Sequence, residues 1–253
     1  MPLNSNFPRS KVSCFSCGLR EMCLPVGLEE NEMDAIDFII NRWRKIQRGN
    51  YLYRAGMDFQ SLYIVRSGFF KTYVLHEDGR EQVTGFHMPG EMLGFEAIST
   101  GAHTCHAAAL EDSETCEIPF TRLEEIGRII PSMMHHFQKI MSSEIVHNYE
   151  TIAILGGMKA GDRLITLLLN LSERFAKLGY SSSNFSLCMT REEIGSYLGL
   201  RLETVSRAFS RLQKDGLIKI NSKNVQLNNI PWLKQRSRGS YSVTDKVVEG
   251  AEL

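Results

Sequence analysis

The spacing of apolar positions changes character along the chain. Between residues 43 and 120, short runs rich in aromatic and β-branched residues alternate with turn signals such as Ser67-Gly68 and Pro89-Gly90. Many short strands separated in this way are typical of an antiparallel sandwich or barrel. The pattern therefore predicts a β domain over this part of the chain.

A helical repeat follows the predicted β domain. Pro131 begins a segment in which apolar residues recur near the seam period of about 3.5 residues. A helix packed only on its own domain would show the same period, but the length of this seam and its place between a β domain and a helical domain favour a dimer interface. Gly156-Gly157 ends the segment as an expected hinge. The predicted interface residues are Met141, Ile145, Asn148, Ile152 and Leu155.

A short amphipathic helix is predicted directly after residue 190. Thr190 is placed as its N-cap, and Glu193 three residues later completes a capping box. Ile194 and Leu198 form one apolar face, and Gly199 supplies the turn that follows. This order of elements is that of the first helix and turn of a helix–turn–helix.

The next predicted helix has two opposite stripes. Val205, Phe209 and Leu212 recur at i, i+4 and i+7, which indicates a buried side. A recognition helix would present the polar stripe to the major groove, where arginine binds guanine and glutamate accepts from cytosine. The polar stripe consists of Glu203, Ser206, Arg207 and Ser210.

Charge and the following segment favour DNA binding over an ordinary amphipathic helical hairpin. Residues 186–224 hold seven basic and four acidic residues, and LIKI-NSKN-VQL predicts a hairpin wing. We therefore predict a winged helix–turn–helix. Its predicted DNA interface is Glu203, Ser206, Arg207, Thr190, Arg191 and Ser210.

The whole-chain charge supports the same division. Lysine plus arginine and aspartate plus glutamate each number 29, so the net charge is zero. Residues 160–253 hold 14 basic and 9 acidic residues, whereas residues 1–159 hold 15 and 20. An acidic part is thus combined with a basic part, and such asymmetry points to a polyanionic partner for the basic part.

Two signals bear on location. No apolar run approaches the roughly 18 residues that a membrane-spanning helix needs. The N-terminal residues MPLNSNFPRS lack the basic and then apolar layout of a signal peptide. We expect a cytoplasmic protein without a membrane partner.

The cysteines are unevenly distributed. Three of the six lie close together as Cys14, Cys17 and Cys23, in a C-x2-C-x5-C pattern. A cytosolic chain rarely uses such residues for structural disulfides, whereas three closely spaced thiols can converge on a metal or cluster. Zinc and iron–sulfur clusters usually take four ligands, so a fourth must come from elsewhere. The spacing alone does not decide between Cys105 and Cys116.

These elements together resemble the CRP/FNR superfamily of transcription regulators, and specifically its FNR branch. The resemblance extends from about Cys14 to Leu227. Its matching elements are the cysteine trio followed by Leu24-Pro25, then SLYIVRSG, TGFHMPGEMLGFEAI, CEIPF and MTREEIGSYLGLRLETVSR.

The resemblance implies an α+β fold. Its parts are an antiparallel β-roll sensor domain (a jelly roll of the cyclic-nucleotide-binding type), a long dimerisation helix and a C-terminal winged helix–turn–helix. The expected ranges are 1–28 for the cysteine-rich cluster-binding segment, 29–130 for the β-roll, 131–157 for the dimerisation helix, 158–230 for the DNA-binding domain and 231–253 for a polar tail.

The resemblance also implies an oxygen-labile 4Fe–4S cluster whose loss weakens dimerisation and DNA binding. The four ligands carry over to Cys14, Cys17, Cys23 and, within CEIPF, Cys116. Cys105 and Cys188 are then expected to be small core residues.

Partner assignments follow from the same resemblance. Base-reading roles carry over to Glu203, Ser206 and Arg207, which implies an operator with a TTGAT-like half-site repeated as an inverted pair. The turn from His76 to Arg80 corresponds to β-roll loops that contact RNA polymerase in this family, although a solvated hairpin tip is an equal alternative.

One seam position departs from the branch. Members can carry an acidic residue where this chain has Asn148, and like charges across a two-fold axis oppose pairing. Because Asn148 is neutral, we expect some dimer to persist without the cluster.

Three alternatives compete with an oxygen-sensing regulator. Residues 82–121 contain no lysine or arginine, whereas a buried cyclic-nucleotide phosphate would require a bidentate arginine, so no cyclic nucleotide is expected. A structural zinc on the same four thiols would give a constitutive or otherwise regulated protein. A thiol oxidoreductase using Cys14 and Cys17 would be expected near a βαβ unit, which is not evident. We expect a regulator and not an enzyme.

Overall fold

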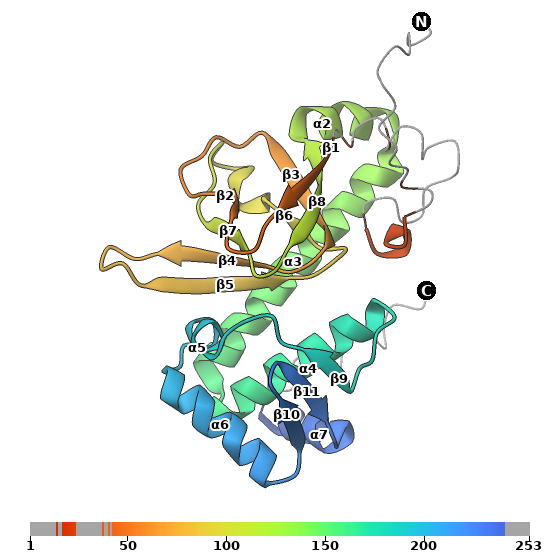
Figure 1. The fold of residues 1–253 in the computed structure, drawn as a ribbon. Coiled ribbons are helices and arrows are strands. Elements are labelled where there is room, and N and C mark those ends of the chain that lie inside the picture. The colour runs from red at the N-terminus through yellow and green to blue at the C-terminus, as the bar shows by residue number, and fades with distance from the viewer. Residues whose placement is uncertain (1–13, 15–16, 24–36, 38–39, 41, 241–253) are drawn as a thin grey trace, which may run out of the picture. The chain divides into compact units, whose positions relative to one another are not determined.

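The computed structural model describes residues 14, 17–23, 37, 40 and 42–240 (Figure 1). Strands dominate its N-terminal part and helices its C-terminal part, as the apolar pattern predicts. The chain forms two compact units. The first comprises Met1–Thr72 and Phe86–Ser142, and the second comprises Tyr73–Gly85 and Ser143–Leu253.

Eight short strands form two four-stranded sheets, with the orders β1-β8-β3-β6 and β2-β7-β4-β5. The first strand pairs with the last, the second with the second-last, and so on inwards. The antiparallel pairs are β1–β8, β2–β7 and β3–β6, and β4 lies next to β5, which is the pairing of a jelly roll. The strands are β1 Arg42–Ile46, β2 Tyr51–Tyr53, β3 Ser61–Ser67, β4 Phe70–Leu75, β5 Glu81–His87, β6 Met92–Leu93, β7 His106–Ala109 and β8 Ser113–Pro119.

The strand register places the centre of β8 between two neighbouring strands of the same sheet. Cys116 is paired with Trp43 of β1 on one side and with Ile64 of β3 on the other. The tight connection after β3 depends on Gly68, which has φ +82°, and a Cβ there would lie 2.1 Å from Ser113 Oγ. The turn therefore excludes a side chain at this position.

Short helices and one long helix follow the strands. In the N-terminal segment and the roll these are the 3₁₀ turns η2 Arg20–Met22 and η3 Phe95–Ala97, and after the roll α2 Phe120–Ile129 and α3 Pro131–Gly157. The bounds of α3 are those predicted for the long helix. Its first turns bury Met133 and Phe137 in a core that also contains Leu62 and Ile118 of the sheet.

The second unit contains the predicted winged helix–turn–helix. A small sheet, in the order β10-β11-β9, forms its wing side. Within this unit, Ser196 Oγ accepts from Val83 N at 2.8 Å and donates to the Glu81 carbonyl at 2.7 Å. The elements are α4 Ala160–Lys177, β9 Asn184–Ser186, α5 Arg191–Leu198, α6 Leu202–Lys214, β10 Ile218–Asn221, β11 Asn224–Leu227 and α7 Ile230–Ser240.

Helix α7 corrects one expectation. The polar tail predicted over 231–253 begins inside this helix, where Leu233 is fully buried and Arg236 Nε donates to the buried carboxylate of Asp162 at 2.9 Å. Lys234 also pairs with Glu173 at 2.8 Å. A mostly polar composition concealed the helix, because its attachment depends on one apolar residue and on charges of a distant helix. Residues 241–253 and 24–36 lie outside the described part.

In the part of the chain that the structure describes, no helix is both long enough and apolar enough to cross a membrane.

Candidate metal centre and nucleic-acid interface

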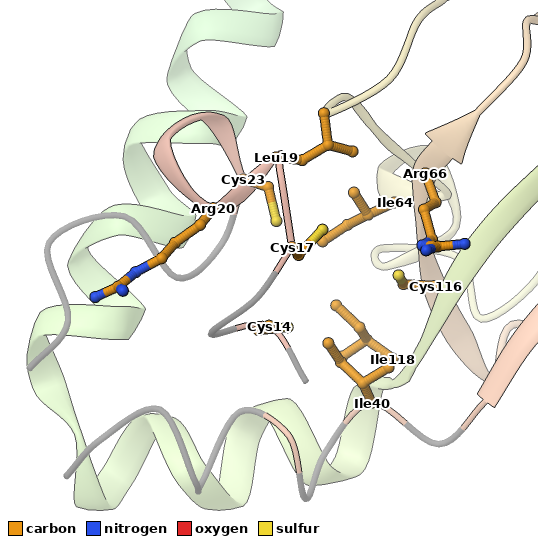
Figure 2. A pocket seen from close by; sticks show the side chains of 10 residues that line it. All are labelled: Cys14, Cys17, Leu19, Arg20, Cys23, Ile40, Ile64, Arg66, Cys116 and Ile118. Carbon is orange, nitrogen blue, oxygen red and sulfur yellow. The ribbon is translucent and has the colours of Figure 1, made fainter. Parts of the chain in front are cut away.

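Four cysteines from two distant parts of the chain line one pocket. Cys14, Cys17 and Cys23 come from the N-terminal segment, and Cys116 comes from the middle of β8 (Figure 2). The pocket has about 410 Å³ of empty space, including part that opens to solvent. The other lining residues are Leu19, Arg20, Ile40, Ile64, Arg66 and Ile118. Cys105 lines no part of this pocket.

Backbone turns arrange the first three cysteines. Cys17 N donates to the Cys14 carbonyl at 3.2 Å, and Arg20 N donates to the Cys17 carbonyl at 3.1 Å. The Cys14 amide also donates to Asp37 Oδ1 at 2.6 Å. Successive tight turns therefore fold this short segment back on itself, and Asp37 ties it to a later part of the chain. The sequence alone carries no signal that marks Asp37.

The thiols lie where ionisation is unfavourable. Burial raises the pKa of Cys14 well above its usual value, and the neighbouring Cys23 and Asp37 raise it further. Burial raises the pKa of Cys116 from 9.0 to about 11, with Cys17 adding to the rise and Arg66 opposing it. Thiolates here would require a nearby positive charge, which a bound metal or cluster supplies.

The donor set fits a thiolate-bound group. Four cysteines in a largely apolar pocket are the ligands that 4Fe–4S clusters take, and a structural zinc takes the same set. All six cysteines are free thiols. Among the described residues, no three histidine, cysteine, aspartate or glutamate side chains are already arranged to hold a single metal ion.

Two of the pocket cysteines share a buried core with the start of α3. Cys14 and Cys23 belong to the same buried core as Met133 and Phe137, with Cys116 packed against it. Burial lowers the pKa of His136, and a hydrogen bond between its side chain and the Cys23 backbone partly opposes this shift. The helix side chains and the thiols thus share one packed environment. The sequence predicts that His135 and His136 lie on different helix faces and are solvated; His135 is exposed, whereas His136 is half-buried.

The helix–turn–helix has the predicted capping. Thr190 Oγ1 accepts from Glu193 N at 3.1 Å, and Glu193 Oε2 accepts from Thr190 N at 2.7 Å. Gly199 ends α5 with φ +62°. A Cβ on Gly195 would lie only 2.7 Å from the Leu200 carbonyl oxygen, so the chain crosses α5 at a residue without a side chain. The capping box that the sequence predicts is confirmed.

Helix α6 has the two sides that its spacing predicts. Val205, Phe209 and Leu212 are buried. All members of the polar stripe are exposed, and these are Glu203, Ser206, Arg207 and Ser210. Because these side chains are exposed, the stripe is accessible to a partner as large as a DNA duplex.

The two remaining predicted DNA contacts differ in setting. Thr190 is exposed at the start of α5. Arg191 is half-buried, and its Cζ lies 3.1 Å from the centre of the Phe209 ring. Burial lowers its pKa to about 10. Arg191 thus packs between the two helices, unlike the outward-facing stripe on α6.

The predicted seam residues lie along α3 with different exposures. Ile145 and Ile152 are 53% and 65% exposed, and Asn148 is also exposed. Met141 and Leu155 are half-buried. Large apolar side chains exposed in a row along one helix are typical of surfaces that another chain covers.

Comparison with known proteins agrees with the fold and the DNA-binding element. Residues 43–128 match the cyclic nucleotide-binding domain family, and residues 162–236 match the Crp-like helix-turn-helix domain family. The transcriptional regulatory protein btr of Bordetella pertussis is 44% identical over 88% of this chain and 92% of its own length. The fumarate and nitrate reduction regulatory protein of Escherichia coli K12 is 42% identical over 88% and 90%.

Solved structures give the same answer. FixK2 from Bradyrhizobium japonicum has a TM-score of 0.71 at 28% identity and covers 80% of this chain and 98% of its own. A CRP/FNR family regulator from Thermus thermophilus, with a TM-score of 0.64 at 20% identity over 79% and 100%, shares the fold. The chain belongs to the CRP/FNR family of transcription regulators. The relatives named above are transcription regulators and not enzymes.

Proposed function

We propose that this regulator senses oxygen through a 4Fe–4S cluster bound by Cys14, Cys17, Cys23 and Cys116. The observation that carries the proposal is that these four thiols, and not Cys105, line one pocket. The similarity to fumarate and nitrate reduction regulators supports the same ligand chemistry. When bound, the cluster supplies the positive iron charge that stabilises the four thiolates, and it supplies the sensitivity to oxygen.

The protein's part is to link the pocket to α3. Ligation by Cys116 would hold the N-terminal segment against β8, and the shared core would carry this constraint to Met133 and Phe137, which belong to it. A group that binds only the ordered form stabilises that form by mass action. We infer that the ordered start of α3 favours a homodimer through Ile145 and Ile152, and that oxygen removes this support.

A dimer would place two recognition helices on successive turns of double-stranded DNA, about 34–36 Å apart. The exposed Arg207 is suited to a guanine and Glu203 to a cytosine, with Ser206 between them. We propose an inverted repeat of TTGAT-like half-sites as operator. Binding should fall steeply with salt because phosphate contacts dominate affinity.

Two further partner proposals rest on the roll. The exposed turn from His76 to Arg80 is available for RNA polymerase. Inside the roll, His103 Nδ1 lies 2.9 Å from Glu96 Oε1, and no lysine or arginine occurs in residues 82–121. The segment offers no arginine to bind a phosphate in a bidentate manner, and Glu96 adds a carboxylate, so we propose that the roll takes no cyclic nucleotide.

The test compares Cys116→Ser with Cys105→Ser after anaerobic purification. We expect Cys116→Ser to lose the visible iron–sulfur absorbance and most bound iron, while Cys105→Ser keeps both. Cys105 is the matched control because it is another thiol of the roll and lies outside the pocket lining. Air exposure of the wild type should remove absorbance and operator binding together. Colourless wild-type protein with one zinc per chain, or the reverse outcome for the two variants, would overturn the proposal.

A further inference from the structure

Arg66 lines the pocket and brings a positive charge beside Cys116, the proposed cluster ligand from strand β8. It lies in β3, and Ile64 two residues earlier lines the same pocket. The pairing of β3 with β8 is irregular between Val65 and Ser67, so Arg66 occupies an irregular position of the strand. Such irregularities re-aim a side chain. Figure 2 shows the guanidinium next to the Cys116 sulfur.

The guanidinium is held on two sides. Arg66 Cζ lies 3.4 Å from the centre of the Trp43 ring, and Trp43 is itself the strand partner of Cys116. Arg66 Nη1 donates to Glu114 Oε2, and Lys45 Nζ lies 3.6 Å from the other oxygen of Glu114. Stacking and pairing together fix the planar group in place. The guanidinium, which belongs to a residue that lines the pocket, is therefore held in one place, and its charge is not spread over a mobile side chain.

The pocket needs such a charge. Four thiolates around a 4Fe–4S core carry net negative charge into walls formed by Leu19, Ile40, Ile64 and Ile118. Uncompensated charge in apolar surroundings is costly. Among the ten lining residues there is no carboxylate, and the two cations are Arg66 and Arg20. Figure 2 shows the Arg20 side chain extending away from the sulfurs.

We propose that Arg66 is a positioning residue of the sensor, which holds a compensating positive charge beside Cys116 and thereby slows loss of the cluster in air. This inference rests on the proposed function. Removing a nearby cation makes it easier for the cluster to lose an electron to oxygen, because a positive charge stabilises the more negative, reduced state. Arg66 thus sets how much oxygen the regulator tolerates.

The experiment measures decay of the anaerobically assembled cluster after mixing with air, together with iron content and midpoint potential. We expect Arg66→Gln to decay at least about threefold faster and to have a lower midpoint potential. Arg66→Lys keeps the charge without the planar stack and should fall between Arg66→Gln and the wild type. Arg44→Gln is the matched control, since Arg44 lies over the Tyr63 ring and outside the pocket lining. It should decay like the wild type.

Glu114→Gln separates charge from packing. It removes the carboxylate that neutralises Arg66 and so should slow the decay and raise the potential. Simple loosening of the pocket would instead make both Arg66→Gln and Glu114→Gln decay faster, which would overturn the proposal. If Arg66→Gln assembles no cluster, the other two variants carry the test. Arg66→Lys should then decay faster than the wild type, and Glu114→Gln should decay more slowly.

Failure of this inference is distinguishable from failure of the proposed function. Wild-type protein without iron–sulfur absorbance contradicts the proposed function itself. Wild-type protein with that absorbance, together with equal decay rates in Arg66→Gln and Arg44→Gln, contradicts only the role of Arg66.

Discussion

The helix–turn–helix and the cysteine pocket are assembled over very different lengths of chain. In the first, neighbouring residues complete one another, as when Leu200 N donates to the Gly195 carbonyl at 2.8 Å. In the second, the N-terminal turns meet a strand that follows most of the β-roll, and Cys116 is placed by its register with Trp43 and Ile64. Local periodicity can specify the first kind of site, whereas only sheet pairing can specify the second.

The largest expected effect tests the local site. Gly195→Ala would put a Cβ 2.7 Å from the Leu200 backbone oxygen, which cannot rotate away. We expect the free energy of unfolding of the second unit to fall by about 3 kcal/mol, measured by urea titration. Gly161→Ala is the control, because a Cβ there meets nothing within 4 Å. Equal stability of both variants would contradict the close crossing.

A somewhat smaller effect is expected at the exposed face of the same element. Arg207→Ala should cost roughly 1–3 kcal/mol of binding free energy at one guanine of the operator. Titration of wild type and variant against the operator, and against an operator changed at that base pair, measures the coupling. Equal loss on every sequence would mean that Arg207 contacts phosphate only.

The α3 seam is a third case, in which the spacing is local but the proposed partner is a second copy of the chain. Ile152→Ala removes a side chain that is 65% exposed. We expect the dimer dissociation constant to rise about tenfold, while the stability of the single chain changes by no more than about 0.5 kcal/mol. Sedimentation equilibrium of anaerobic protein measures the first quantity. Ile129→Ala, exposed on α2, should leave the dimer unchanged; equal weakening would refute the assignment.

The smallest effect concerns a roll cysteine outside the pocket. Burial, with Glu96 as the next cause, raises the pKa of Cys105 from 9.0 to about 12. The unfolded chain therefore releases this proton first, so the stability from the neutral thiol is present below pH 9 and is lost as pH rises towards 12. The destabilisation caused by Cys105→Ala should shrink between pH 7 and about pH 10. Unfolding titrations at both values check this, and an unchanged difference would argue against the shift.

Much of the fold follows from periodicity along the chain. The capping box at Thr190, the buried stripe through Phe209 and the start of α3 at Pro131 are all patterns of residues three to seven apart, and each has the predicted structure. Helix α7 escaped prediction because it packs against α4, which is distant in the sequence, and Arg236 pairs there with Asp162.

The candidate site divides in the same way. The cysteine spacing predicts a metal or cluster, and the family resemblance selects Cys116, but the residues alone left Cys105 open. Asp37, His136 and Arg66 carried no signal beyond their type, although Arg66 lies inside the matching segment SLYIVRSG. Their importance depends on which thiol each one lies beside.

The sequence by itself determined the long helix α3, the helix–turn–helix and the exposed polar stripe of α6, because short-range periodicity and local hydrogen bonds are encoded by neighbouring residues. It also indicated cysteine as the chemical type of the candidate metal ligands. Tertiary structure alone decided that Cys116 shares a pocket with the N-terminal thiols and that Arg66 is fixed between Trp43 and Glu114. Those contacts arise from the register of β1, β8 and β3, and the spacing of residues along the chain does not predict that register.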